Sequence, residues 1–320
     1  MAPPPGRCAW PTKEIPAIAS DSAWLVGMGC ELHRVGAAPA ASGAPHLLLD
    51  PVAGAWEKRP GERVAHAGVA SSDDAIFMVG GMVVFGGDTL RVRAYELKKS
   101  AWRDLPPLPH QALPNPDATG LEGVAALAHD GRLYAFGGRW VGHTLRPRWD
   151  GALDVESGQA QRAWVLDGDK WRELPALPRP SSFASAVWFE DRIWLVGGGE
   201  DRFTSPVEDV VSFDPVSESW RTESPLARPT AGGVVVHHGR IYAFSSFVMD
   251  AGGPQIYDPE ARVWRSTAAR EKRLPSRLQE GVAVVDDRIV VLESDSHAQE
   301  SRLFEYIPTE DRWLVLGAQR

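Results

Sequence analysis

The chain has 320 residues, 43% of them hydrophobic, with a formal net charge of -8 and a pI near 5.6. This is enough apolar material for a large core, and the acidic balance argues against a non-specific nucleic-acid binder, which needs clustered positive charge. No apolar run approaches the roughly 18 residues that a membrane-spanning helix requires, so we expect neither a nucleic-acid partner nor a membrane span.

The N-terminal segment, residues 1–14, has no apolar stretch of the kind that forms a signal peptide. We therefore expect the chain in the cytoplasm, or in the periplasm or outside the cell if its start is incomplete. Cys8 and Cys30 are expected as free thiols, with a bridge between them as the alternative in an exported protein. Trp10 either begins an outer strand that closes the fold or lies in a loop over the closing seam.

Six tryptophans recur in a fixed setting through the remaining chain, 44 to 69 residues apart. Each follows a large apolar residue by seven positions, and three of these residues are followed by Asp-Pro, as in Phe213-Asp214-Pro215. The apolar residue ends one strand, Asp-Pro opens the turn, and the tryptophan begins the next strand. The pattern predicts six outer hairpins, around Trp56, Trp102, Trp171, Trp220, Trp264 and Trp313.

A second hairpin is predicted upstream of each of the last four tryptophan hairpins. Two β-rich runs are joined there by a short turn signal such as Asp130-Gly131. Repeats 1 and 2 fit this pattern less closely, and in both of them the alternative is that the assigned strands are shifted by one hairpin. Their predicted strands are 23–26 and 30–35 in repeat 1, and 75–79 and 82–85 in repeat 2, with Gly80-Gly81 as the turn and Gly86-Gly87 as a glycine doublet.

Each repeat thus contains four short strands, and one such sheet cannot bury both of its faces alone. Six sheets arranged radially bury one another and leave only short edges. The Arg-Ile-Tyr-like strand, the Gly-Gly doublet, Tyr/Phe-Asp-Pro and Trp together resemble the Kelch repeat over about residues 15–316, and bacterial six-bladed Kelch proteins in particular. We expect an all-β, six-bladed Kelch-type β-propeller with four antiparallel strands per blade, and with blades at about 15–59, 60–105, 106–174, 175–223, 224–269 and 270–320.

The resemblance implies one ligand face, because Kelch proteins present ligands to the loops between strands 2 and 3 and to the blade-to-blade connections. Three arginines recur at near-equivalent places in successive repeats, and radial geometry is expected to bring Arg179, Arg228 and Arg277 around one opening. Guanidinium groups so placed suit carboxylates or phosphates; alternatively they pack on a tryptophan or cap a carbonyl. The candidate ligand-binding residues are Arg139, Trp140, Arg179, Ser181, Glu200, Arg202, Arg228, Thr230, Phe247, Arg277 and Gln279.

The longest insertion, residues 138–162, lies between strands 2 and 3 of repeat 3 and mixes cations with aromatic residues. It is interpreted either as a functional loop or as a solvated, partly disordered one. His237-His238 are assigned to a hairpin turn rather than to a metal site. Because no nucleotide-binding or nucleophile motif occurs in a suitable setting, the catalytic residues, if any, stay unknown from the sequence, which predicts no cofactor and no metal.

Function is predicted mainly from the resemblance. It implies a monomeric binding scaffold whose loop face holds a protein, peptide or glycan ligand of anionic character. The alternative is a sugar-active enzyme of the sialic acid mutarotase type, which needs an acid/base pair in the mouth of the propeller. A galactose-oxidase-like oxidase is a third hypothesis, but it requires a Tyr–Cys crosslink, and all five tyrosines fall in predicted strands.

Overall fold

The computed structural model describes residues 8, 10, 15, 18–19, 23–36, 46–50, 53–61, 63–83, 87–147, 153–199, 205–245, 253–267, 278–295 and 300–316. In this part of the chain the regular structure is almost entirely strand, β1 to β30, with two single-turn 3-10 helices at Leu97–Lys99 and His110–Ala112. No helix among these residues is long and apolar enough to cross a membrane.

Most strands form six antiparallel sheets of four, each from one consecutive stretch of chain, and each sheet is called a blade. Blade 1 contains β2 (Ala23–Met28), β3 (Glu31–Gly36), β4 (His46–Asp50) and β5 (Ala55–Lys58). Blade 2 contains β7 (Gly68–Ser71), β8 (Ala75–Val79), β11 (Val92–Glu96) and β12 (Ala101–Leu105). Blade 3 contains β13 (Ala125–His129), β14 (Arg132–Phe136), β17 (Ala163–Asp167) and β18 (Lys170–Leu174).

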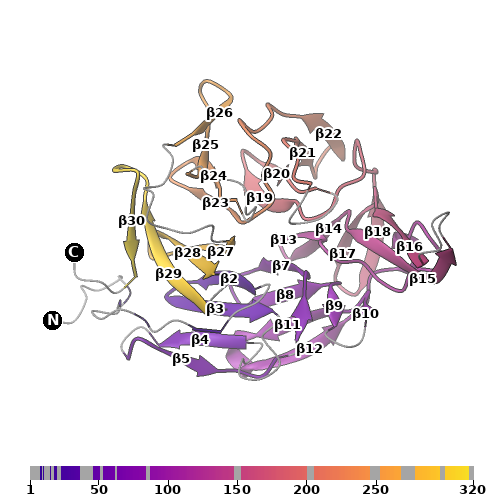
Figure 1. Cartoon of the computed structure of the whole chain (residues 1–320), viewed down its shortest axis with the longest axis horizontal. Helices are drawn as coiled ribbons and strands as arrows, with labels where there is room; N and C mark the ends of the chain where they lie inside the picture. Colours follow the sequence, from indigo (N-terminus) through magenta and orange to yellow (C-terminus); the bar gives the residue numbers. More distant parts are fainter. Residues whose placement is uncertain are drawn as a thin grey trace.

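The second half of the chain repeats this arrangement. Blade 4 contains β19 (Ser185–Phe189), β20 (Arg192–Val196), β21 (Val210–Asp214) and β22 (Ser219–Thr222). Blade 5 contains β23 (Val234–His237), β24 (Arg240–Ala243), β25 (Gln255–Asp258) and β26 (Val263–Ser266). Blade 6 contains β27 (Leu278–Val285), β28 (Arg288–Asp295), β29 (Glu300–Ile307) and β30 (Arg312–Val315). The all-β, six-bladed propeller is confirmed, and Figure 1 shows its blades around a central axis.

The innermost strands of the blades face a central channel of about 280 Å³, lined mainly by glycine, alanine and valine. Neighbouring strands approach each other closely at this radius. A Cβ atom on Gly27 would lie 2.3 Å from the carbonyl oxygen of Val284, and one on Gly68 would lie 2.5 Å from that of Val124. Glycine is therefore required where the inner strands of adjacent blades meet.

Blade 2 follows the shifted alternative. Residues 75–79 form its second strand, not its first, and they pair with β7 across a turn at Asp73–Asp74. Gly80-Gly81 is consequently the glycine doublet rather than a turn. Its φ angles are +63° and +96°, and a Cβ on Gly80 would lie 2.4 Å from the carbonyl oxygen of Leu121 in the next connection. In blade 1 the predicted strands are present, but the turn between them is tighter than predicted and lies at Gly29-Cys30.

In five of the six outer hairpins, the large apolar residue of the sequence pattern lies opposite its tryptophan. Phe213 lies opposite Trp220 in the β21–β22 register, with ring centroids 4.9 Å apart. In blade 3 the residue opposite Trp171 is Leu166. Trp164 comes two residues earlier in β17 and lies opposite Glu173. The reason is the two-residue turn at Gly168-Asp169, which is shorter than the Asp-Pro turns and moves the register by two residues.

Three of these tryptophans also tie consecutive blades together. Each indole N–H donates a hydrogen bond to a proline carbonyl that follows the outer strand of the preceding blade. The pairs are Trp102 to Pro60 at 2.7 Å, Trp171 to Pro106 at 2.8 Å, and Trp220 to Pro175 at 2.9 Å. The repeated tryptophan therefore supplies both apolar contact area and a directed polar contact between blades.

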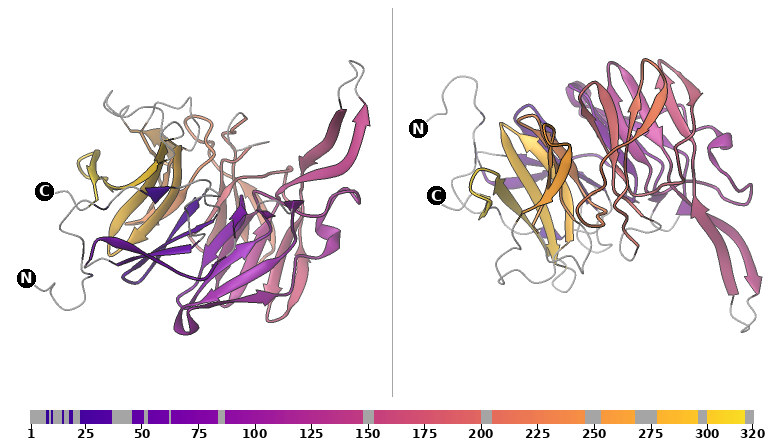
Figure 2. Two further views of the ribbon diagram at one scale, coloured as in Figure 1. Left: turned by 60° about the horizontal axis from the view of Figure 1, so that its bottom comes forward. Right: turned by 90° about the horizontal axis from the view of Figure 1, so that it is seen from above.

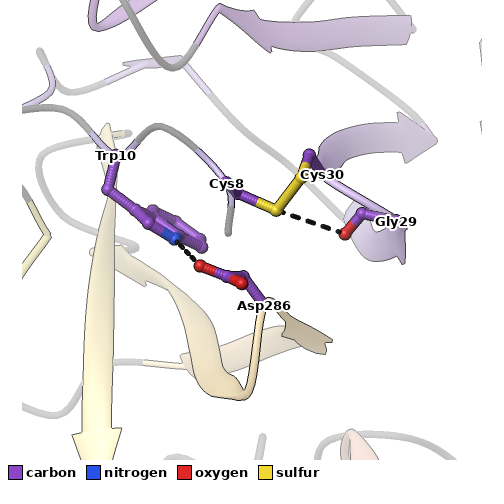
Figure 3. Close-up of a disulfide and its surroundings, with 5 residues drawn as sticks. All are labelled: Cys8, Trp10, Gly29, Cys30 and Asp286. Atoms are coloured by element: carbon purple, nitrogen blue, oxygen red, sulfur yellow. Dashed lines mark hydrogen bonds between the residues drawn. A yellow bond between two sulfur atoms is a disulfide. The ribbon is translucent and has the colours of Figure 1, made fainter. Parts of the chain in front are cut away.

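The N-terminal segment spans the seam between blades 1 and 6 (Figure 3). Cys8 forms a disulfide with Cys30 in the β2–β3 turn, so the expectation of two free thiols is wrong. Trp10 lies in a loop, and its indole donates to Asp286 in the β27–β28 turn at 2.9 Å. The added closing strand is β1 (Ile18–Ala19), which lies after the 1–14 segment and pairs with the start of β29.

Two small sheets lie outside the blades. β6 (Val64–Ala65), β9 (Met82–Val83) and β10 (Gly87–Asp88) form one of them. The insertion in repeat 3 is not an irregular loop, because it forms a hairpin of β15 (Arg139–Pro147) and β16 (Leu153–Gln159). Figure 2 shows this hairpin projecting away from the body of the propeller.

Candidate functional site

The strand order gives the propeller two distinct faces. The connections between strands 2 and 3 of a blade and the connections between blades emerge on one face, which is called the loop face. The turns between strands 1 and 2 and between strands 3 and 4 emerge on the other, which is called the turn face. The described candidate residues belong to connections on the loop face, except Gln279, which lies in β27.

A charged cluster lies next to the loop-face end of the channel, formed by His66, Glu122 and Arg139. Glu122 precedes β13 and Arg139 follows β14, and their backbones are joined by two hydrogen bonds of 2.9 and 2.6 Å. His66 precedes β7 and has a left-handed backbone, with φ of +54°. Its carbonyl accepts a hydrogen bond from the N–H of Gly123 at 2.7 Å. Backbone contacts between neighbouring connections therefore set the positions of the three side chains.

Glu122 is the centre of this cluster and is only 5% exposed. Its Oε2 lies 2.6 Å from His66 Nδ1, and its Oε1 accepts a hydrogen bond from Arg139 Nη1 at 2.5 Å. Burial acts to raise the pKa of Glu122, but the hydrogen bonds and positive charges of His66 and Arg139 outweigh it, so the pKa lies below its ordinary value. The carboxylate is therefore ionised at neutral pH and holds His66 in a fixed orientation.

A second concave site, the Arg179 groove, occupies about 300 Å³ on the loop face. The connection from blade 3 to blade 4 forms one wall, and residues of β16, β20 and β21 complete it. Its apolar floor includes Leu177, Leu195 and Val211, while Arg179 and Ser181 line its polar part. Such a mixture of an apolar surface with a few polar groups is typical of binding sites.

Arg179 is 64% exposed at its side chain and makes an ion pair of 2.8 Å with Asp209. Gln159, the last residue of β16, also lines the groove, and its amide donates to Ser182 Oγ at 3.1 Å and to the carbonyl of Gly199 at 2.8 Å. The groove thus adjoins the base of the projecting hairpin.

Arg228 and Thr230 do not line this groove. The Arg228 guanidinium donates to the carbonyl of Gly253 and to Ser266 Oγ, which corresponds to the predicted capping alternative. Thr230 is 2% exposed and accepts a hydrogen bond from the buried amide of Gln255 at 2.6 Å. Asp209 lies in the β20–β21 connection of blade 4, whereas Gly253 and Ser266 belong to blade 5, so the two guanidinium groups bond to different blades. That Arg179, Arg228 and Arg277 surround one opening stays a prediction.

The remaining candidates divide into three groups. Trp140 is 8% exposed and packs in the core beside Gly158 of the hairpin. Gln279 lies in β27 opposite Glu293. The other candidates fall outside the described residues: Glu200, Arg202, Phe247 and Arg277.

Sequence analysis missed His66 and Glu122. They come from two different blade-to-blade connections, 56 residues apart, and neither belongs to a motif. A signal was nevertheless present, since both residues lie in the last few positions before the first strand of a blade, as Ser181 and Thr230 do.

No family model matches the chain. Alpha-scruin of Limulus polyphemus is 26% identical over 167 residues, which cover 50% of this chain and 16% of that protein. The human Kelch repeat and BTB domain-containing protein 13 is 30% identical over 146 residues, 45% of this chain and 28% of the relative. The Kelch-like protein terF of Aspergillus terreus is 24% identical over 219 residues, 62% of this chain and 43% of the relative. The chain therefore spans less than half the length of each of these relatives.

Proposed function

The chain belongs to the Kelch-repeat propellers as a distant homologue of the scruins and the Kelch-like proteins, and we propose that it binds a protein partner through its loop face. Kelch propellers typically bind proteins. The observation that carries the proposal is the Arg179 groove, a concave site with an apolar floor that adjoins the projecting hairpin.

An acidic segment fits this groove best. Arg179 offers a forked donor suited to a carboxylate, and its present partner, Asp209, forms an exposed ion pair of the kind that contributes little to stability. Arg179 pairs with Asp209 through Nη1, so its other N–H donors can bind a carboxylate of the partner, while apolar side chains of the partner cover Leu177 and Val211. The adjacent hairpin extends the contact area beyond the groove.

The test compares Arg179→Ala with Arg265→Ala. Arg265 lies in β26 of blade 5 with its side chain 69% exposed, close to the 64% of Arg179, so it controls for loss of one exposed positive charge. Immobilised protein is incubated with an extract of the producing cells, and the retained proteins are identified by mass spectrometry. We expect a partner retained by the wild type and by Arg265→Ala but lost from Arg179→Ala. Equal retention by both variants, or retention of a glycan alone, would contradict the proposal.

A second candidate function is a sugar-active enzyme of the mutarotase type, and the His66–Glu122 pair is the observation that favours it. Opening and closing a cyclic sugar needs an acid and a base held close together, and these two side chains lie 2.6 Å apart beside the channel. Acceleration of the anomeric exchange of sialic acid, measured by NMR and lost in Glu122→Gln, would support this function; no acceleration at micromolar protein would remove it. The galactose-oxidase-like hypothesis requires a crosslink between a tyrosine and a cysteine. Because Cys8 and Cys30 form a disulfide with each other, neither can form this crosslink, and we do not propose an oxidase.

A further inference from the structure

Two equivalent turns of neighbouring blades meet on the turn face. The β23–β24 turn of blade 5 carries His237 and His238, and the β27–β28 turn of blade 6 carries Asp287. Both turns have left-handed residues at their two central positions, with φ of +46° for His238 and +64° for Asp287. This is the geometry of a tight two-residue hairpin turn, and it presents the histidine and aspartate side chains toward each other.

Three atoms that can bind a metal converge at this point. Asp287 Oδ1 lies 3.1 Å from His237 Nε2 and 2.6 Å from His238 Nε2, and the three atoms all lie within 4.8 Å of one another. Around a tetrahedral zinc ion with ligands at about 2.0–2.1 Å, neighbouring ligand atoms are about 3.3 Å apart. The two distances from Asp287 Oδ1 differ from this value by well under 1 Å, and the two imidazole nitrogens lie within 4.8 Å of each other. The exposed side chains of His238 and Asp287 can supply the adjustment that an ion requires.

The two arginines that follow these turns form their ion pairs with carboxylates other than Asp287. Arg240 follows the first turn and pairs with Asp258, while Arg288 follows the second and contacts Glu305 and the ring of Trp10. Among the described residues, the ion pairs of Asp287 are with the two histidines alone. The carboxylate thus faces two imidazole nitrogens rather than a fixed positive charge.

We propose that His237, His238 and Asp287 form a site for Zn²⁺ or a similar divalent transition ion that links blades 5 and 6. Two imidazoles and one carboxylate are ligands that zinc prefers, and the fourth position is open to water. Binding places the ring proton of His237 on Nδ1, which is buried and has no hydrogen-bond partner among the residues that the structure describes. Because metal-binding histidines are normally stabilised by a partner at that nitrogen, the affinity should be moderate.

Blade 3 offers an internal control at the same position of its first hairpin. His129 ends β13 as His237 ends β23, and it lies 3.6 Å from Asp130. Its ring stacks on Trp188 of the next blade, with ring centroids 3.6 Å apart, and no second imidazole contacts it in the described part of the chain. A single histidine in the same kind of turn should not bind the ion.

The experiment uses the full chain without a histidine tag, treated with EDTA and dialysed, and titrates it with ZnCl₂ by calorimetry at pH 7.5. We expect one equivalent to bind the wild type, and we expect His238→Asn and Asp287→Asn to weaken binding at least about tenfold. Asparagine tolerates the left-handed turn, so both variants should fold. His129→Asn should bind as the wild type does, and Co²⁺ should give tetrahedral visible absorption with the wild type and His129→Asn only.

Absence of binding to the wild type would overturn the proposal. So would an unchanged affinity in His238→Asn, or a loss of binding in His129→Asn equal to that in Asp287→Asn. Binding of millimolar Mg²⁺ without binding of Zn²⁺ would also contradict it, because imidazole ligands do not select magnesium.

Discussion

His33 and His46 form a buried pair in blade 1. They are 1% and 0% exposed, and His33 Nδ1 lies 3.0 Å from His46 Nε2. The ring of His46 also packs edge-on against Tyr95 of blade 2 at 4.4 Å. Burial lowers the pKa of His46 from its ordinary 6.5 to about 4, with a smaller effect of the neighbouring His33, and burial lowers the pKa of His33 as well. Both rings are therefore neutral in the folded protein at pH 7.

Because of this pair, we expect the folded protein to lose stability in acid at pH values well above the pKa of carboxylates. Below about pH 6.5 the unfolded chain binds a proton at His46 that the folded protein does not bind until about pH 4, so folding loses stability as pH falls through this window. Between pH 7.5 and pH 5 the free energy of unfolding should fall by about 2 kcal/mol from His46. Urea unfolding at the two pH values measures this change.

The matched variant is His46→Gln, which has no titrating group. It should be less stable than the wild type at pH 7.5 but should lose less stability between pH 7.5 and pH 5. An equal loss in both proteins would show that His46 does not carry the pH dependence.

At the scale of the element, the outer hairpins hold neighbouring blades together. Trp220 of β22 packs on Phe213 in its own blade and lies 5.6 Å, between ring centroids, from Phe136 of blade 3. Its indole also bonds to the carbonyl of Pro175, which follows blade 3. One side chain therefore links two blades by apolar contact and by one hydrogen bond.

Replacing this tryptophan separates the two contributions. Trp220→Ala should lower the free energy of unfolding by about 3 kcal/mol, because it removes a large aromatic group from between two sheets. Trp220→Phe keeps most of the contact and loses the indole hydrogen bond, so it should cost about 1 kcal/mol. Denaturant unfolding of both variants tests this, and a near-neutral Trp220→Ala would mean that the tryptophan does not hold the blades together.

At the scale of the whole molecule, the N-terminal segment closes the ring from several directions. The disulfide attaches it to blade 1, while Trp10 bonds to Asp286 and stacks with Arg288 of blade 6 at 4.8 Å. Ile15 is 4% exposed, and its N–H donates to the carbonyl of Leu316. The strand β1 then pairs with β29. The first and last blades thus share a covalently anchored segment.

Breaking the disulfide should therefore weaken closure. We expect reduction, or Cys30→Ser, to lower the free energy of unfolding by about 2 kcal/mol, the low end for loss of a native disulfide. Thermal unfolding with and without dithiothreitol measures the change, and the Cys8→Ser/Cys30→Ser double variant should not respond to the reductant. A wild-type midpoint that is unaffected by dithiothreitol would contradict this role.

Local patterns in the sequence predicted most of the architecture. Turn chemistry and alternating apolar residues act between near neighbours, so Asp-Pro turns and tryptophan spacing were sufficient for the six outer hairpins. Errors arose where two local signals competed. The residues Gly80-Gly81 are compatible with a hairpin turn as well as with a glycine doublet. The structure distinguishes the two, because a Cβ on Gly80 would lie 2.4 Å from the carbonyl oxygen of Leu121 in the next connection.

The sequence by itself determined the class of fold and the number of blades, because the same strand and turn signals recur in each repeat, while the loop face was implied by the resemblance to Kelch proteins. The tertiary structure alone decided which side chains from different repeats meet. His66 with Glu122 and His237 with Asp287 are joined by the circular arrangement of the blades, and Cys8 with Cys30 by the N-terminal segment at the closing seam. Their positions depend on how sheets pack around an axis, and this packing leaves no periodic trace in the chain.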